Sequence, residues 1–284
     1  MSNYRYPLIV FLGGACYGIL STIVKTAYAA GINRTGVTSG EFFFGLVFLL
    51  PFALRSMRRL AGRQWLALLA AGIPMGGTSI FYYHALETIS ASLAVVLLFQ
   101  YILITLVFET FVRRRLPSRW KLLAFALVLP GSLLASGVMT GGALTADAAG
   151  IGYGLLSALS YATMLFLSGT VARGVPSVCK AAVMAIGGAL VTFLVLPPDF
   201  LTDGALFLRV LPYGLPLGVL GVTLPPLLFA IGIPHTGIGL AGILTSSELV
   251  IAMLSACFVL GEPVAPSAWL GIALIFAGIV VANR

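Results

Sequence analysis

The sequence predicts an all-α membrane protein in which ten transmembrane helices form two inverted five-helix repeats, with both termini cytoplasmic. Three observations predict this fold class. Apolar stretches of about twenty residues recur along the chain, only 8% of the residues are charged, and the basic residues gather in particular loops. Inside lipid, a helix satisfies its own backbone hydrogen bonds. Little of the chain remains for a soluble domain, so any binding site is expected within the bundle.

The ten predicted spans are separated by short gaps. They cover residues 7–30, 37–54, 65–86, 90–112, 120–139, 148–171, 177–197, 209–232, 237–260 and 265–282. Each is long enough to cross a hydrocarbon core about 30 Å thick. The first span also mimics a signal peptide, because Arg5, an apolar run and Ala27-Tyr28-Ala29 follow one another. Its apolar run exceeds the usual signal-peptide length of about 7–15 residues, so we expect a transmembrane helix instead.

Glycine and proline shape several of these spans. Glycines four residues apart offer small faces for close helix packing in spans one, six and eight. These pairs are Gly14 with Gly18, Gly150 with Gly154, and Gly214 with Gly218. Proline interrupts spans three, five and eight, and the pair Pro225-Pro226 near the centre of span eight is a candidate hinge or cavity wall. Three tryptophans near span ends are expected to be interface anchors: Trp65, Trp120 and Trp269.

The positions of the cations predict the orientation. Most lie in the loops after spans two and four: Arg55, Arg58, Arg59, Arg63, Arg113, Arg114, Arg115, Arg119 and Lys121. Only Lys25, Arg34 and Arg209 fall on the opposite side. Because Lys and Arg collect in cytoplasmic loops, both termini are expected inside the cell. The net charge of +8 therefore reflects topology, and no nucleic-acid partner is expected.

Residues 1–140 and 146–284 are predicted to be the two repeats. A shift of 143 residues places Gly31 on Gly174 and Gly45 on Gly188, and a shift of 147 places Leu93 on Leu240 and Gly131 on Gly278. Five spans are an odd number, so the second repeat must enter the membrane inverted relative to the first. Inverted repeats of this kind are a recurring design of secondary transporters.

Three groups of segments carry a family resemblance. They are Glu248-Leu249-Val250 with Leu260-Gly261-Glu262 and Trp269–Gly278, then Gly154–Tyr161, and Tyr83–Leu86 with Ala91–Ala94. On these residues the whole chain resembles the ten-span, EamA-like branch of the drug/metabolite transporter superfamily, and within it bacterial amino-acid exporters, including those for aromatic amino acids. The resemblance implies a multi-pass exporter of metabolites in the bacterial inner (plasma) membrane. Two positions depart from the family pattern: Leu249 stands where proline is common, and Glu41 where a basic residue is common.

Polar groups within the spans form the candidate site, since an ionised side chain at the bilayer centre costs about 2.5–3.5 kcal/mol and usually faces a cavity. Glu248, near the middle of span nine, is the clearest candidate, and its repeat counterpart is Tyr101. A structural hydrogen bond between helices is the alternative role. The predicted substrate-binding residues are Thr78, Tyr82, Phe99, Tyr101, Ser157, Tyr161, Ser246, Ser247 and Glu248. Their rings and hydroxyls would suit a small amphipathic solute, although packing between helices explains each ring equally well.

The other polar residues have structural interpretations. Lys25 and Glu41 are expected to form an interfacial ion pair, with an outer gate or a carboxylate anchor at Lys25 as the alternative. His84, Glu87 and His235 are expected in loops, and their spacing predicts no metal site, so no metal and no cofactor are expected. Three cysteines in separate spans are interpreted as small core residues: Cys16, Cys179 and Cys257.

These features predict a transporter that moves a small-molecule substrate by alternating access through a central cavity in the lipid bilayer. Amino acids are the expected substrates, with another metabolite or drug-like compound as the alternative. A channel would need a continuous pore. An intramembrane enzyme is not expected, because the chain has no Gly-x-Ser-x-Gly elbow, no His-Glu-x-x-His motif and no pair of intramembrane Asp. Proton coupling and facilitated diffusion both stay open, and the sequence leaves the oligomeric state open while being compatible with a monomer.

Overall fold

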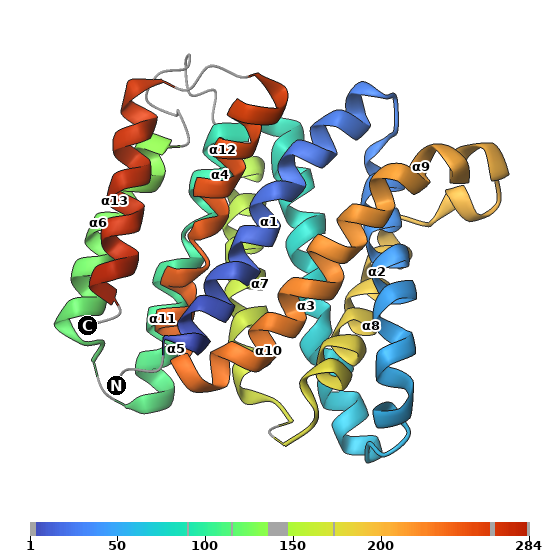
Figure 1. The fold of residues 1–284 in the computed structure, drawn as a ribbon, viewed down its shortest axis with the longest axis horizontal. Helices are drawn as coiled ribbons and strands as arrows, with labels where there is room; N and C mark the ends of the chain where they lie inside the picture. Colours follow the sequence, from blue (N-terminus) through green and yellow to red (C-terminus); the bar gives the residue numbers. More distant parts are fainter. Residues whose placement is uncertain are drawn as a thin grey trace.

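The computed structural model describes residues 4–89, 91–114, 116–135, 147–172, 174–261 and 265–282, and every regular element within them is a helix. The first half contains α1 (Arg5–Ala29), α2 (Arg34–Met57), α3 (Gly62–Thr88), α4 (Ala91–Leu98), α5 (Tyr101–Arg113) and α6 (Arg119–Ala135). The second half contains α7 (Ala148–Thr170), α8 (Ser177–Val195), η1 (Asp199–Leu201), α9 (Gly204–Leu217), η2 (Gly218–Thr223), α10 (Leu224–Thr236), α11 (Ile238–Leu244), α12 (Ser247–Leu260) and α13 (Pro266–Ala282). Figure 1 shows these helices standing side by side as a bundle.

Eight helical stretches in the described residues are long and apolar enough to cross a membrane, and α13 is a shorter apolar helix of 17 residues. The helix α6 also has 17 residues, and the predicted end of its span at 136–139 lies outside the described residues. The all-α membrane fold is therefore confirmed. A total of ten spans and the cytoplasmic placement of the termini stay predictions.

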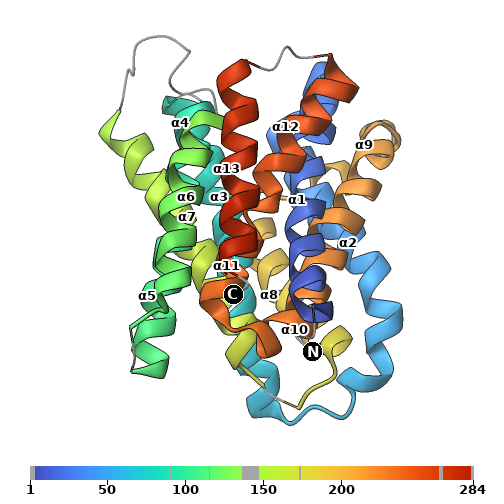
Figure 2. The ribbon, with the colours of Figure 1, turned by 60° about the vertical axis from the view of Figure 1, so that its left-hand side comes forward.

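The two halves repeat the same order of elements. A shift of 143 residues moves α1 to 148–172, where α7 lies, and a shift of 147 moves both ends of α6 onto the ends of α13. The turn between α1 and α2 and the turn between α7 and α8 both contain a glycine with positive φ, Gly31 at 75° and Gly174 at 91°. A backbone with positive φ favours glycine, because glycine has no Cβ atom. Figure 2 shows that α1 starts at the end of the bundle where both termini lie, whereas α7 starts at the opposite end.

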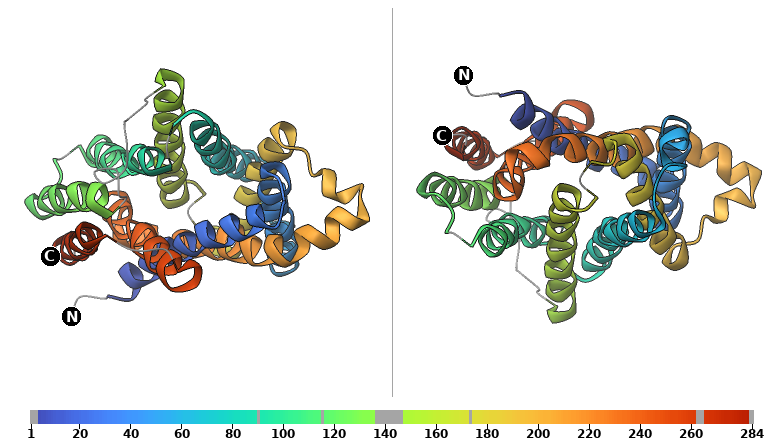
Figure 3. Two further views of the ribbon diagram at one scale, coloured as in Figure 1. Left: turned by 90° about the horizontal axis from the view of Figure 1, so that it is seen from above. Right: turned by 90° about the horizontal axis from the view of Figure 1, so that it is seen from below.

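Helices from different halves pack closely through glycine. A Cβ atom at Gly14 or Gly18 of α1 would overlap the backbone of the α11–α12 segment, and one at Gly72 of α3 would overlap α8 at Met184. The predicted packing role of the Gly14–Gly18 face is therefore confirmed. Figure 3 shows α6 and α13 side by side at one edge of the bundle, with η1 and α9 at the other edge.

Three predicted spans are not continuous α-helices. Span four divides into α4 and α5 at Phe99-Gln100, and span nine divides into α11 and α12 at Thr245-Ser246. Span eight begins earlier than predicted, at Gly204, and contains the π-helical turn η2 directly before Pro225-Pro226. Proline lacks an N–H and cannot continue the α-helical ladder, so a change of helix type next to this pair has a direct physical cause.

The loop assignment of three polar residues is wrong. His84 and Glu87 lie within α3, which continues to Thr88, and His235 lies in the last turn of α10. Each histidine ring is hydrogen-bonded to the carbonyl oxygen four residues earlier. His235 also stacks on Tyr6 with ring centroids 3.8 Å apart. These contacts give each imidazole a hydrogen-bond partner in its own helix, so both histidines can be part of a helix.

Candidate functional site

The interruption of span four begins where Gln100 changes its backbone hydrogen bond. Its N–H donates to the Leu97 carbonyl, three residues earlier, at 3.1 Å, instead of to the Val96 carbonyl. The released Val96 carbonyl accepts a hydrogen bond from the Gln100 side-chain Nε2 at 3.2 Å. A buried carbonyl without a partner would be costly in this apolar setting, so the Gln100 amide stabilises the interruption.

The interruption of span nine has the same construction. The Ser246 N–H donates to the Ile243 carbonyl at 3.2 Å, three residues earlier. The Thr245 hydroxyl lies 3.0 Å from the Gly242 carbonyl oxygen, which the shifted backbone bond has released. Hydroxyl side chains compete with helical backbone bonds in this way. Discontinuous helices at corresponding positions in two repeats are a known mark of transporter binding sites.

A set of five residues, here called the central cluster, joins the two interruptions: Tyr17, Tyr101, Tyr161, Thr245 and Glu248. The hydroxyls of Tyr101 and Thr245 are hydrogen-bonded at 3.1 Å. The Tyr161 hydroxyl donates to Glu248 Oε2 at 3.3 Å, and the Tyr161 ring lies 4.5 Å from the Tyr101 ring and 5.9 Å from the Tyr17 ring, centroid to centroid. Such ring pairs contribute about 0.5–1.5 kcal/mol each. The cluster thus links α1, α5, α7 and the α11–α12 segment.

Burial within the central cluster is uneven. Tyr101 and Thr245 are fully buried and Tyr161 is 3% exposed, whereas Glu248 and Tyr17 retain part of their accessible surface. A carboxylate with accessible surface beside aromatic ring faces is suited to an ammonium group, which gains a charge-assisted hydrogen bond and cation–π contacts.

The other predicted site residues differ in where their polar groups lie. Ser157, Ser246 and Ser247 are fully buried, and each hydroxyl donates to a backbone carbonyl. For Ser247 that carbonyl belongs to Phe11 of α1, so this serine ties α12 to α1. Ser157 and Ser246 instead donate to carbonyls of their own segments, so all three hydroxyls are bonded to backbone in this structure.

Three predicted site residues belong to α3 and to the interruption of span four. Thr78 is half-buried and donates to the Pro74 carbonyl of its own helix at 2.8 Å. Tyr82 is half-buried and interacts electrostatically with Glu248. Phe99 is 2% exposed and packs on Tyr101 with ring centroids 5.6 Å apart.

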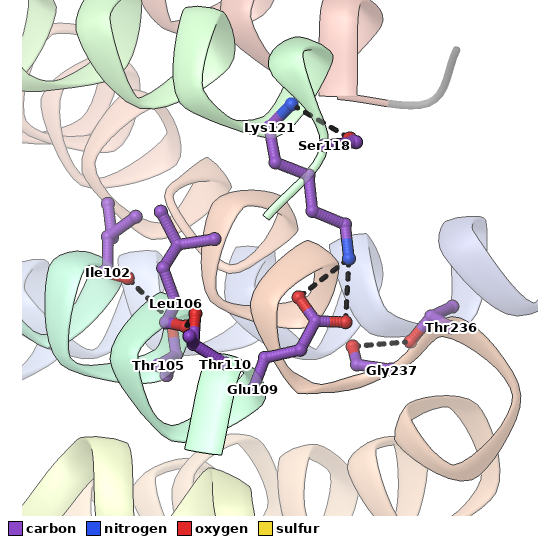
Figure 4. Close-up of polar contacts among 9 residues, drawn as sticks. All are labelled: Ile102, Thr105, Leu106, Glu109, Thr110, Ser118, Lys121, Thr236 and Gly237. Carbon is purple, nitrogen blue, oxygen red and sulfur yellow. Dashed lines mark hydrogen bonds and ion pairs between the residues drawn. The ribbon is translucent and has the colours of Figure 1, made fainter. Parts of the chain in front are cut away.

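Sequence reasoning did not include Tyr17 in the site, and it missed a buried ion pair. Lys121 Nζ of α6 lies 2.7 Å from both carboxylate oxygens of Glu109 of α5. Figure 4 shows the lysine side chain reaching across to this carboxylate. The Glu109 carboxylate also contacts Gly239 at the start of α11. A carboxyl group inside predicted span four was the signal in the sequence.

Comparison with known proteins places this arrangement in a family. The model of the EamA-like transporter family matches the chain twice, over residues 5–137 and 148–284. The chain belongs to the EamA-like transporter family. As an EamA-like transporter it is a multi-pass membrane protein that moves a small-molecule substrate, and its two family matches correspond to the two halves of the bundle.

Relatives of this EamA-like transporter cover most of its length. An uncharacterized transporter of Archaeoglobus fulgidus is 29% identical over 97% of this chain and 95% of its own length. The threonine/homoserine exporter RhtA of Escherichia coli is 28% identical over 87% of this chain and 80% of its own length. A crystal structure at 20% identity has a TM-score of 0.81 and covers 99% of this chain and 97% of its own. That likeness supports the fold.

Proposed function

We propose that this transporter exports amino acids, or metabolites with a similar amine, across the bacterial inner membrane by alternating access. The observation that carries the proposal is the Glu248 carboxylate, which keeps accessible surface at an interrupted helix and is held by the Tyr161 hydroxyl. An amino acid brings an ammonium group that this carboxylate can bind. The export of threonine and homoserine by a relative that aligns with 87% of this chain supports the same substrate class.

The wider proposal includes the topology. Residues 1–140 and 146–284 would be inverted five-span repeats with both termini inside the cell, so that the central cluster lies near the membrane midplane between them. Substrate would pass among the residues predicted for the site: Thr78, Tyr82, Phe99, Tyr101, Ser157, Tyr161, Ser246, Ser247 and Glu248. The buried serine hydroxyls would shape this route by holding its walls, and the half-buried side chains would contact the solute.

Flux into liposomes that contain the purified protein tests the function. Labelled threonine, homoserine and phenylalanine are supplied outside, with unlabelled substrate inside. We expect saturable uptake that the internal substrate stimulates, because a carrier exchanges substrates across its two states. Flux equal to that of empty vesicles for every amino acid would refute amino-acid export, and currents without saturation would indicate a channel.

The variant Glu248→Gln tests the assigned site. It keeps the size of the side chain and removes the negative charge, so we expect loss of amino-acid exchange. Asp199→Asn, which changes an exposed carboxylate in η1, is the matched control and is expected to transport like the wild type. Equal exchange by wild type and Glu248→Gln would show that the carboxylate does not bind the substrate.

A further inference from the structure

A second buried carboxylate lies outside the central cluster, on α2. Glu41 is 8% exposed, and its Oε1 contacts Gly221 in the π-helical turn η2, where a Cβ atom would overlap the carboxylate. The carbonyl of Gly221 would accept backbone hydrogen bonds from residue 225 or 226 in an α- or π-helix, and both residues are proline. The carboxylate therefore lies beside a helical turn whose ordinary hydrogen bonding is interrupted.

A separate observation points to a small ligand at this place. Thr38, one turn before Glu41 on α2, is fully buried, and its hydroxyl makes no hydrogen bond of ordinary length and angle within the described residues, although the Tyr83 phenol lies within reach of it. Residues three apart on a helix share a face. The Tyr83 phenol of α3 lies close enough to interact with both Thr38 and Glu41. Buried hydroxyls normally make well-formed hydrogen bonds, so a hydroxyl with only a loose contact to Tyr83, beside a buried carboxylate, leaves hydrogen-bonding capacity for a small species.

We propose that Glu41 is the site at which this transporter binds and releases a proton during its transport cycle, separate from the substrate site at Glu248. The proposal rests on the export function proposed above. Binding adds H⁺ to the carboxylate and gives a neutral carboxylic acid, whose O–H can then donate to the Thr38 hydroxyl or to the Gly221 carbonyl. A neutral acid is far cheaper to bury in an apolar bundle than an ion, so proton binding would favour the state in which η2 packs on α2.

Tyr17 connects this site with the central cluster. It interacts electrostatically with both Glu41 and Glu248, and it stacks edge-on against Tyr161. Titratable side chains that interact with Glu41 within the described residues include Tyr17 and Tyr28 of α1 and Tyr83 of α3. A change of charge at Glu41 therefore changes the electrostatic potential near Glu248, the carboxylate proposed to bind the substrate. The ion pair of Glu41 with Lys25 stays a prediction. The variant Lys25→Gln, included in the experiment below, distinguishes a role in this ion pair from a role in proton binding.

Two transport assays in liposomes distinguish proton binding from substrate binding. The first measures exchange of labelled for unlabelled threonine without a pH gradient, and the second measures accumulation driven by an imposed pH gradient with choline in place of Na⁺. Glu41→Gln is expected to retain exchange and lose gradient-driven accumulation, whereas Glu41→Asp and Lys25→Gln are expected to retain both. Undiminished accumulation by Glu41→Gln, or a requirement of the wild type for Na⁺, would overturn the proposal.

Absence of amino-acid transport by the wild type would refute the proposed function but would not test the proton site. A spectroscopic measurement tests the proton site independently. Infrared spectra of the purified wild type are recorded as the pH is raised. We expect the C=O stretch of a protonated carboxylic acid to disappear on alkalinisation, to shift in Glu41→Asp and to be missing in Glu41→Gln. Identical titrations of wild type and Glu41→Gln would overturn the assignment of Glu41.

Discussion

Removing one partner of the ion pair between Lys121 and Glu109 is predicted to lower the stability of the fold strongly. The Lys121 and Glu109 side chains are 15% and 5% exposed, and Nζ lies 2.7 Å from both carboxylate oxygens. Lys121→Met keeps most of the apolar stem and removes the charge, so the Glu109 carboxylate remains buried without its lysine. Breaking a buried pair from one side costs about 3–5 kcal/mol.

The structure favours the lower end of that range. A cavity of about 100 Å³, lined in part by Glu109, Thr170 and Gly237, adjoins the carboxylate. Water occupies about 30 Å³ per molecule in the liquid, so this space can admit water that partly solvates Glu109. We therefore expect Lys121→Met to lower the free energy of unfolding by about 3 kcal/mol. At roughly 2–4 °C per kcal/mol, the melting temperature in detergent falls by about 6–12 °C.

Three native cysteines provide the assay. Cys179 is buried, and Cys16 and Cys257 are partly buried, so a maleimide dye that fluoresces on reaction reports unfolding during heating. The double variant Glu109→Gln with Lys121→Met should recover most of the lost stability, since both charges of the pair are removed together. If Lys121→Met melts with the wild type, or if the double variant melts no higher than Lys121→Met, the reasoning from a desolvated pair is wrong.

Three further predictions follow from packing, hydrogen bonding and topology. Gly218→Ala should destabilise the fold by about 1–3 kcal/mol, because the new Cβ would overlap the backbone of α2. Gly152→Ala should be neutral or stabilising by up to about 1 kcal/mol, because the new Cβ would have no atom within 4 Å. Thermal unfolding of the two variants tests this difference. Tyr101→Phe removes the hydrogen bond to Thr245, worth about 1 kcal/mol, and should slow threonine exchange in liposomes while the protein still elutes as a folded species. Arg59→Cys in an otherwise cysteine-free chain should react with an impermeant maleimide in cells only after permeabilisation, and reaction in intact cells would reverse the predicted orientation.

Hydropathy predicted the positions of most helices because lipid leaves the backbone little alternative to a helix. The match of Gly31 with Gly174 in the sequence also has a backbone cause, since both glycines have a positive φ that favours glycine. The interruption at Phe99-Gln100 was not predictable from the local sequence, because apolar helix-forming residues flank it and neither proline nor glycine marks it. Its stabilising bond from the Gln100 side chain to the Val96 carbonyl is local, and the adjacent Tyr101 is hydrogen-bonded to Thr245, 144 residues away in sequence.

The sequence indicated candidate residue types for the site, but it did not indicate the directions of their side chains. A carboxylate within span nine is rare enough to single out Glu248, but its Tyr161 partner is 87 residues away in sequence, and only the fold brings them together. Hydroxyl groups were harder, since Ser157 and Ser246 satisfy carbonyls of their own segments. Lys121 was assigned to a basic loop by its neighbours, although its side chain turns inward to Glu109.

The contact between α6 and α13 is built from reciprocal glycine contacts. Gly131 packs against Gly271, and Gly278 packs against Ala124. A shift of 147 residues places Ala124 on Gly271 and Gly131 on Gly278, so it exchanges the two contacts. Reciprocal contacts of this kind are the signature of a two-fold interface. Under the proposed alternating access, such an interface would persist while the two halves exchange conformations.

The Glu109–Lys121 pair has no such counterpart, because the same shift places these residues on Ala256 and Ala268. One half therefore carries a buried charge pair that the other half lacks. Alternating access between otherwise related halves requires the two end states to be close in free energy, and a one-sided pair biases that balance toward the state in which it forms. We expect Lys121→Met to shift the population away from the conformation described here, which distance measurements between spin labels at the two ends of the bundle would detect as a changed ratio of two distances. An unchanged ratio would show that the pair stabilises both states equally and acts on the fold alone.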